Sequence, residues 1–106
     1  MERTISADNL KALLANNSSI TLLDVRRAED RAKEPVSIPG ATWKDPTDVD
    51  NWKNKLDSNK DIVIYCVRGG SVSNSVVDAL QAKGLKARYI EGGIEAWKAM
   101  GGETKA

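Results

Sequence analysis

Short apolar runs alternate with helix-like segments along the whole chain, and this alternation constrains the fold more than any other feature. The strand-like runs cover residues 20–23, 41–43, 62–66 and 87–90. Periodicity and capping residues predict helical segments over about 6–16, 26–34, 48–56 and 71–83, and a last one after residue 93. Strands that alternate with helices are typical of βαβ units. The sequence therefore predicts an α/β fold with a parallel sheet and helices on both of its faces.

Start and stop residues support several of these helices. Ser6 is a suitable N-cap for the first one, and Pro35 stops the helical turn within 26–34. Gly84 suits the position just after the helix over 71–83. The residues expected to face the core from the helices over 48–56 and 71–83 are Val49, Trp52, Leu56, Val72, Val76, Val77 and Leu80. Core packing is also the expected role of the three tryptophans, Trp43, Trp52 and Trp97.

Length and composition exclude several classes of function. The 106 residues are enough for a single domain, 1–106. With 16 basic against 15 acidic residues the net charge is only +1, which argues against a dedicated nucleic-acid binder. The chain has no His and one Cys, so we expect no Ser–His or Cys–His catalysis, no metal site of the usual zinc type and no intramolecular disulfide.

The apolar segments are too short for a membrane protein. The longest, residues 62–67, has six residues, whereas a spanning helix needs about 18. No apolar run of signal-peptide length follows the N-terminus. A free Cys fits a reducing compartment, so the expected location is cytoplasmic.

The loop that begins at Cys66 is the strongest candidate for a reactive site. A buried strand would bring Cys66 to the edge of the sheet, and the glycines that follow allow successive backbone N–H groups to form an anion-binding nest. The next helix points its positive end at the same place, Arg68 adds a full charge, and the hydroxyls of Ser71 and Ser73 are further donors. These groups favour a thiolate over a thiol, which is the remaining route to a nucleophile in a chain without His. The alternative is that Cys66 is only a small buried apolar residue.

A second strand is expected to end at the same edge of the sheet as Cys66. Asp24 and Arg26 end the run at 20–23, and ligands of parallel α/β sheets sit beyond the carboxyl ends of the strands. Direct contact with substrate is one interpretation of these two residues. A buried ion pair that ties loops together is the preferred one. For Arg31, a place in the solvated surface is preferred over one above the pocket.

Four segments together resemble the single-domain rhodanese family of thiosulfate-type sulfurtransferases. They are Leu-Leu-Asp-Val-Arg at 22–26, Ile-Pro-Gly-Ala at 38–41, the Cys loop at 64–69, and Tyr-Ile-Glu-Gly-Gly-Ile-Glu-Ala-Trp at 89–97. Their order and spacing carry the resemblance, which covers nearly the whole chain. It implies a rhodanese-like fold with a five-stranded parallel sheet.

The resemblance also implies a reaction. Cys66 would take the outer sulfur of thiosulfate or a similar small anionic donor as a persulfide, and cyanide, a thiol or a protein would accept it. No cofactor, nucleic acid or membrane is implied. The implied donor-binding residues are Val67, Arg68, Gly69, Gly70, Ser71, Val72 and Ser73, with Asp24 and Arg26 in support. Arg68 at the third place of the loop resembles members that use thiosulfate rather than mercaptopyruvate.

The chain departs from the family pattern in two places. The sixth place of the loop holds Ser71, where many members have Arg, and residues 36–37 are Val-Ser where the family usually has Gly-His. The loop has the sulfurtransferase length, whereas phosphatases of the same fold have one residue more. Two alternatives to an active enzyme remain: a sulfur carrier or partner-binding module with little thiosulfate turnover, and an anion-binding regulatory domain with an inert Cys.

Overall fold

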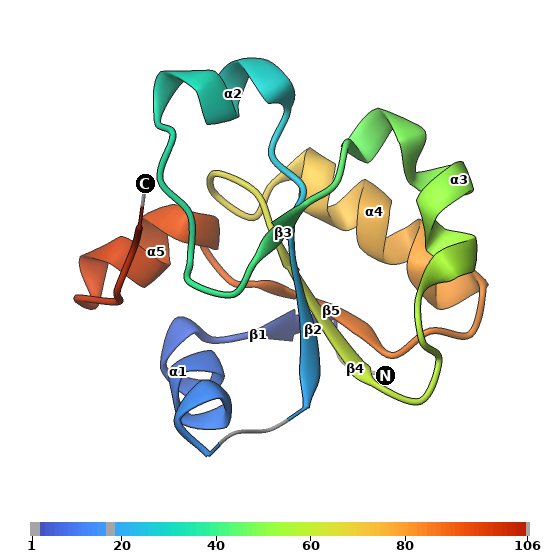
Figure 1. The fold of residues 1–106 in the computed structure, drawn as a ribbon, viewed down its shortest axis with the longest axis horizontal. Helices are drawn as coiled ribbons and strands as arrows, with labels where there is room; N and C mark the ends of the chain where they lie inside the picture. Colours follow the sequence, from blue (N-terminus) through green and yellow to red (C-terminus); the bar gives the residue numbers. More distant parts are fainter. Residues whose placement is uncertain (1–2, 17–18, 106) are drawn as a thin grey trace.

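Five strands form one parallel sheet in the order β1-β5-β4-β2-β3 (Figure 1). The computed structural model describes residues 3–16 and 19–105. The strand bounds are β1 Thr4–Ile5, β2 Ile20–Asp24, β3 Thr42–Trp43, β4 Asp61–Tyr65 and β5 Ala87–Ile90. The five-stranded parallel sheet is confirmed. Its edge strand β1 was not among the strands predicted from the apolar runs.

Helices cover both faces of the sheet, as predicted. Their bounds are α1 Ala7–Ala15, α2 Ala28–Lys33, α3 Val49–Trp52, α4 Ser71–Ala82 and α5 Gly93–Ala99. In Figure 1, α1 and α5 lie on one side of the sheet, α3 and α4 lie on the other, and α2 lies beyond the end of β2. The predicted caps are confirmed at two helices. Ser6 accepts a hydrogen bond from the Asn9 amide at 3.1 Å, and Gly84 takes a positive φ just after α4.

The short helix predicted within 48–56 is present but covers less of the segment than expected. It is α3, four residues long, between two 3-10 turns, Pro46–Asp48 and Lys53–Lys55. The first turn is tight because the side chain of Asp45 accepts from the Thr47 amide at 2.9 Å, and the Asp45 carbonyl accepts from the indole of Trp52 at 2.8 Å. The apolar side of the segment still faces inward, with Trp52 buried.

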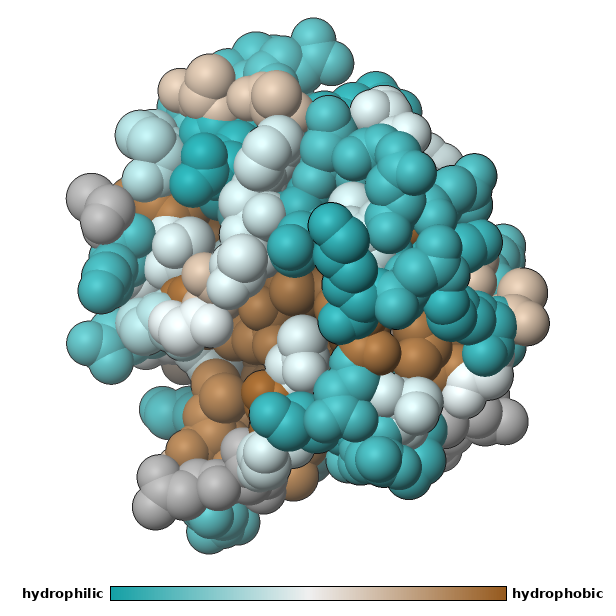
Figure 2. All heavy atoms as spheres, turned by 45° about the vertical axis from the view of Figure 1, so that its right-hand side comes forward, coloured by the Kyte–Doolittle hydropathy of each residue, from teal (hydrophilic) through white to brown (hydrophobic). Residues whose placement is uncertain are grey.

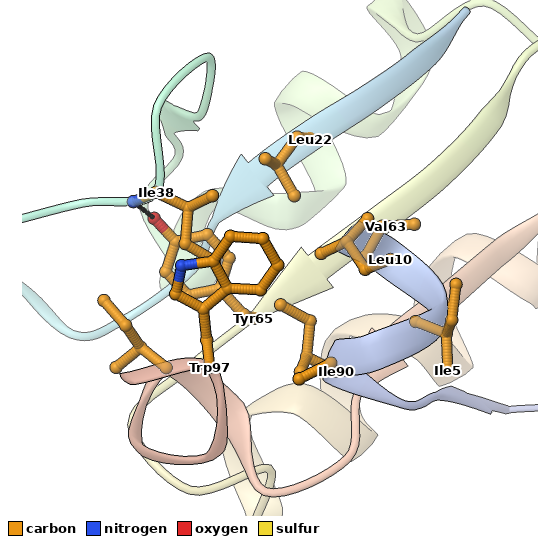
Figure 3. Close-up of a cluster of buried hydrophobic side chains, with 10 residues drawn as sticks. Ile5, Leu10, Leu22, Ile38, Val63, Tyr65, Ile90 and Trp97 are labelled. Carbon is orange, nitrogen blue, oxygen red and sulfur yellow. Dashed lines mark hydrogen bonds between the residues drawn. The ribbon is translucent and has the colours of Figure 1, made fainter. Parts of the chain in front are cut away.

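The pleat of β4 divides the core into two halves. Ile62 and Ile64 face the half under α3 and α4, while Val63 and Tyr65 face the half under α1 and α5. Figure 3 shows the second half, in which Trp97 lies beside Tyr65. Burial raises the pKa of Tyr65, and its hydroxyl accepts a hydrogen bond from the Ile38 amide at 3.2 Å. Both faces of β4 are therefore anchored, which fixes the position of the residue that follows it.

Hydrophilic side chains dominate the molecular face drawn in Figure 2, and hydrophobic atoms appear mainly across its middle and toward its lower left. Within residues 3–16 and 19–105, no helix has the length and apolar character needed to cross a membrane.

Candidate active site

Cys66 is the first residue after β4, a strand paired on both sides. It is buried, with 6% of its surface exposed. In Figure 1 the loop that follows, residues 67–70, curls from the end of β4 into α4 on the side of the sheet where α2 lies. The rigid central strand thus delivers the thiol to the carboxyl edge of the sheet, where parallel α/β proteins bind ligands.

The sulfur of Cys66 has a hydroxyl partner. Ser73, in the first turn of α4 and fully buried, donates a hydrogen bond from Oγ to Cys66 Sγ at 2.9 Å. A donor held this way stabilises a charged sulfur, because hydrogen bonds to ions are stronger than those between neutral groups. Ser71 and Ser73 were both predicted to be hydrogen-bond donors at this site. The hydrogen bond to sulfur belongs to Ser73, and Ser71 is exposed.

Backbone amides in the first turn of α5 donate hydrogen bonds to the carbonyl groups at the start of the loop. The amide of Ile94 donates to the Cys66 carbonyl at 3.0 Å, and the amide of Glu95 donates to the Val67 carbonyl at 3.2 Å. This approach requires Gly93, because a Cβ there would lie 2.5 Å from the Val67 oxygen and 2.6 Å from the Cys66 oxygen. The second glycine of the Gly-Gly pair therefore supports the cysteine loop, a role the sequence analysis did not assign.

The carbonyls at the start of the loop are thus paired, whereas, in the part of the chain that the structure describes, the backbone N–H groups of the loop are not. Among the described residues, the backbone N–H groups of 67–73 have no hydrogen-bond acceptor within the protein. The last three of them belong to the first turn of α4, where N–H groups lack an acceptor in the helix and the helix dipole is positive. Unpaired donors around a buried sulfur are suited to holding an anion.

A pocket of about 360 Å³ opens at Cys66. Arg27 and Asp30 line it together with Arg68 and other residues of the loop. Of the seven predicted donor-binding residues, five line this pocket: Val67, Arg68, Gly70, Ser71 and Val72. Gly69 packs instead against the backbone near Ile90 and Gly92, and Ser73 approaches the sulfur from the protein interior.

Arg27 and Asp30 were missed by the sequence analysis. They come from the segment that connects β2 to α2 and from α2 itself, so their place at the pocket depends on how that segment folds over the cysteine loop. The only signal in the sequence was that they closely follow Asp24 and Arg26, at a strand end already expected to lie near Cys66.

Asp24 and Arg26 form a buried ion pair, each side chain 1% exposed, with Arg26 Nη2 2.7 Å from Asp24 Oδ2. Burial opposes the charge of Arg26, but the hydrogen bond and charge of Asp24 outweigh it and raise the pKa of the guanidinium. Arg26 also donates to the carbonyls of Glu34 and Val36, at 3.0 and 2.7 Å. The pair thus joins β2 to the segment after α2, and neither residue lines the pocket at Cys66.

Arg31 lies outside this pair, with about half of its side chain exposed. Its Nε is 3.9 Å from Asp24 Oδ2, and its guanidinium lies 5.5 Å from the centre of the Trp43 ring.

Many solved structures are similar to this chain in fold. A rhodanese-related protein from Thermoplasma volcanium has a TM-score of 0.84 at 25% identity, with 98% of each chain covered. A rhodanese-like domain protein from Staphylococcus aureus has a TM-score of 0.82 at 31% identity, covering 99% of this chain and all of that one.

Curated relatives differ in length. The chain is 31% identical over 87 residues to the thiosulfate sulfurtransferase GlpE of Coxiella burnetii, covering 81% of this chain and 78% of that protein. It is 32% identical over 78 residues to a tRNA sulfurtransferase of Desulfurococcus amylolyticus, and 36% identical over 50 residues to a tRNA 2-selenouridine synthase of Shewanella. The matches cover 74% and 47% of this chain, and only 15% and 14% of those two longer proteins.

The family model described as rhodanese-like domain matches residues 6–100 of the sequence. These residues include all five helices and every strand except β1. Together with the likeness to GlpE, this match shows that the chain belongs to the rhodanese-like domain family, to which sulfurtransferases belong.

Proposed function

We propose that the protein is a sulfurtransferase that moves a sulfane sulfur from thiosulfate, or a similar anionic donor, to a nucleophilic acceptor through a persulfide on Cys66. The Cys66 thiolate attacks the outer sulfur of thiosulfate. A new S–S bond forms on Cys66, the S–S bond of thiosulfate breaks, and sulfite leaves with the electron pair. The acceptor then attacks the outer sulfur of the persulfide, and Cys66 leaves as a thiolate.

The observation that carries this proposal is the combination of donors around one buried sulfur. Ser73 donates to Sγ, and the N–H groups of residues 67–73 have no acceptor among the described residues. A persulfide carries its negative charge on the outer sulfur, one bond further out than a thiolate. A ring of donors at the pocket mouth is suited to that charge in both states.

The cation at the pocket favours an anionic donor. Arg68 is exposed, lines the pocket, and has no ion-pair partner in the described part of the chain. A guanidinium suits the oxygens of a sulfonate-like group as it does those of carboxylate or phosphate. Sulfite would leave from the oxygen-bearing end of the donor, so Arg68 would both orient the donor and stabilise the departing charge.

Intact-mass measurement after incubation with thiosulfate tests the proposal directly. The protein is expected to gain one sulfur atom, which added cyanide removes, and Cys66→Ser protein is expected to gain none. An adduct that persists in the Cys66→Ser protein would contradict a persulfide on Cys66. Absence of an adduct with thiosulfate and with other sulfur donors would contradict the enzymatic proposal and favour a domain with an inert Cys.

A second candidate function is a sulfur carrier that passes the persulfide to one partner and turns over thiosulfate slowly. It is favoured by the alignment with a small part of the long tRNA sulfurtransferase and tRNA 2-selenouridine synthase. Steady-state assay with thiosulfate and cyanide separates the two. Repeated turnover supports the enzyme, and a single round of sulfur loading with slow discharge supports the carrier.

A further inference from the structure

Arg27 lies where three adjoining pockets meet. One is the pocket of about 360 Å³ at Cys66, a second has a volume of about 310 Å³, and a third of about 340 Å³. Arg27 lines all three, and the first two also share Ser71 and Val72. The site at Cys66 therefore continues past Arg27 into a groove that extends beyond the cysteine loop.

The second pocket is suited to a short chain with a charged end. Besides Arg27, its wall contains three hydroxyl-bearing residues and three apolar ones: Thr47, Ser71, Ser75, Pro46, Val72 and Val76. Arg27 is its only charged residue, and no carboxylate is among the described residues that line it. Acidic residues are present instead in the other two pockets, as Asp30 beside Cys66 and as Glu29 and Asp45 on the far side.

The charge of Arg27 is not used by the fold. In residues 3–16 and 19–105 its guanidinium has neither an ion-pair partner nor a hydrogen bond, and the side chain is exposed. Its neighbour Arg26 is the opposite case, buried and paired with Asp24. Because Arg26 is fixed at the end of β2, the backbone of Arg27 starts from a fixed point at the groove.

The two cations at the site face different parts of it. Arg68 lines the pocket at Cys66 and is not in the walls of the other two, whereas Arg27 lines all three. Thiosulfate is only a few atoms across, so a donor bound at Cys66 and Arg68 leaves the second pocket empty. A longer molecule with sulfur at Cys66 would fill it.

We propose that Arg27 determines acceptor specificity, by binding the carboxylate of a thiol whose carbon chain lies in the second pocket and whose sulfur reaches Cys66. The inference rests on the proposed function and names the class of acceptor for the same site. The acceptor thiolate attacks the outer sulfur of the Cys66 persulfide. The S–S bond to Cys66 breaks, the acceptor leaves as a persulfide, and Cys66 is restored as a thiolate, so no external oxidant or reductant is needed.

A matched pair of acceptors isolates the carboxylate. Mercaptohexanoate and mercaptohexanol, each with the thiol at one end and the polar group at the other, differ only in that polar group. With persulfide-loaded protein, mercaptohexanoate is expected to discharge the sulfur about tenfold faster, the factor expected for a hydrogen-bonded charge pair. Arg27→Gln should remove this preference by slowing mercaptohexanoate alone.

Lys33→Gln is the control variant. It removes one positive charge from an exposed position of α2, the helix that begins directly after Arg27. Lys33 lines none of the three pockets, so this variant should preserve the preference for mercaptohexanoate. Equal discharge by both acceptors in the unaltered protein would overturn the proposal. So would an equal slowing of both by Arg27→Gln, or a loss of the preference in Lys33→Gln.

A binding measurement keeps this inference separate from the sulfurtransferase proposal. Mercaptohexanoate titrated into Cys66→Ser protein, followed by amide chemical shifts, is expected to perturb Thr47, Ser71 and Ser75 and to bind about tenfold more weakly when Arg27→Gln is added. Should no persulfide form with any donor, the proposed function fails, and this titration still decides the role of Arg27. Binding of the same strength with and without Arg27 would overturn it.

Discussion

The hydroxyl of Ser73 donates a hydrogen bond of 2.9 Å to the sulfur of Cys66. Ser73 lies in the first turn of α4, and Cys66 is the residue directly after β4. Ser73 is fully buried and Cys66 nearly so. The strand and the helix are each anchored by the core, so the two atoms are held together by the scaffold rather than by the loop between them. The sulfur of Cys66 is thus positioned by rigid elements on both sides.

Ser73→Ala is expected to slow alkylation of Cys66 by iodoacetamide near neutral pH. Ser73 donates a hydrogen bond to the sulfur, and such a bond stabilises a charged sulfur by roughly 1.5–3 kcal/mol. Without the hydroxyl, the sulfur that attacks iodoacetamide loses that stabilisation. A decrease of roughly three- to tenfold in the alkylation rate follows, because a less stabilised thiolate is also a stronger nucleophile and offsets part of the loss.

Ser75→Ala is the matched control for this measurement. Ser75 lies in the same helix but is exposed and has no contact with the sulfur, so its removal should leave the alkylation rate within about twofold. Equal rates for the Ser73→Ala and unaltered proteins would show that the hydrogen bond does not control reactivity.

Gly93→Ala is expected to destabilise the protein and to displace the cysteine loop. Gly93 has φ +62°, which costs an L-residue about 1–2 kcal/mol, and its added Cβ would overlap the carbonyl oxygens of Cys66 and Val67. These are backbone atoms that no side-chain rotation can move away. Denaturant unfolding should therefore show a loss of roughly 3–5 kcal/mol, and the folded fraction should load sulfur poorly.

Gly101→Ala separates the overlap from the backbone conformation. Gly101 also has a positive φ, of +82°, but a Cβ there meets nothing within 4 Å. Its replacement should cost only the conformational part, about 1–2 kcal/mol, and leave sulfur loading intact. Similar losses in both variants would mean that the contact between Gly93 and the loop is unimportant.

The central strand and the long helix after it were predictable because local patterns of apolar residues indicate both. The run at 62–66 is continuously apolar, as expected for a strand buried on both faces, and the helix over 71–83 buries apolar residues with the helical period, so the place of both follows from the sequence. Strand β1 has only two residues, Thr4 and Ile5, and is a strand solely because it pairs with β5. No local pattern predicts such a strand.

The parts of the site that were missed depend on contacts distant in sequence. Gly93 supports Cys66 across 27 positions, and Arg27 reaches the cysteine pocket because a loop from another strand folds over it. Ser71 and Ser73 were given the same role because both follow the loop. Only the direction in which α4 turns decides that Ser73 faces the sulfur.

Asp24→Asn is expected to destabilise the fold by about 3–5 kcal/mol, because it leaves the buried charge of Arg26 without its partner. Arg26 would then hold the Glu34 and Val36 carbonyls less firmly. Thermal or denaturant unfolding measures the loss. Sulfur loading of the protein that remains folded should change little, since Asp24 does not line the pocket.

Asp78→Asn provides the comparison for an exposed pair. Asp78 is 2.7 Å from Arg3, but its side chain is 67% exposed, so its replacement should cost less than about 1 kcal/mol. A loss of sulfur loading in Asp24→Asn without a loss of stability would contradict the structural role and point to contact with substrate.

Arg68→Ala is expected to weaken the first half of the reaction far more than the second. Arg68 lines the pocket at Cys66 but not the groove beyond it, so its charge is expected to act on a donor bound at Cys66. Loss of a guanidinium that binds a sulfonate-like group should slow persulfide formation from thiosulfate about tenfold. Discharge by a neutral thiol should stay within about twofold, because that acceptor has no charge for Arg68 to bind.

The two half-reactions can be timed separately by intact mass, first during loading with thiosulfate and then during discharge by mercaptohexanol. Arg68→Lys keeps the charge but loses the planar pair of donors, so it should load faster than Arg68→Ala and slower than the unaltered protein. Arg27→Gln should show the reverse pattern, with loading nearly normal and discharge by mercaptohexanoate slowed. If Arg68→Ala slowed both half-reactions equally, Arg68 would be acting on the sulfur of Cys66 itself rather than on the donor, and the division of the site between the two arginines would be wrong.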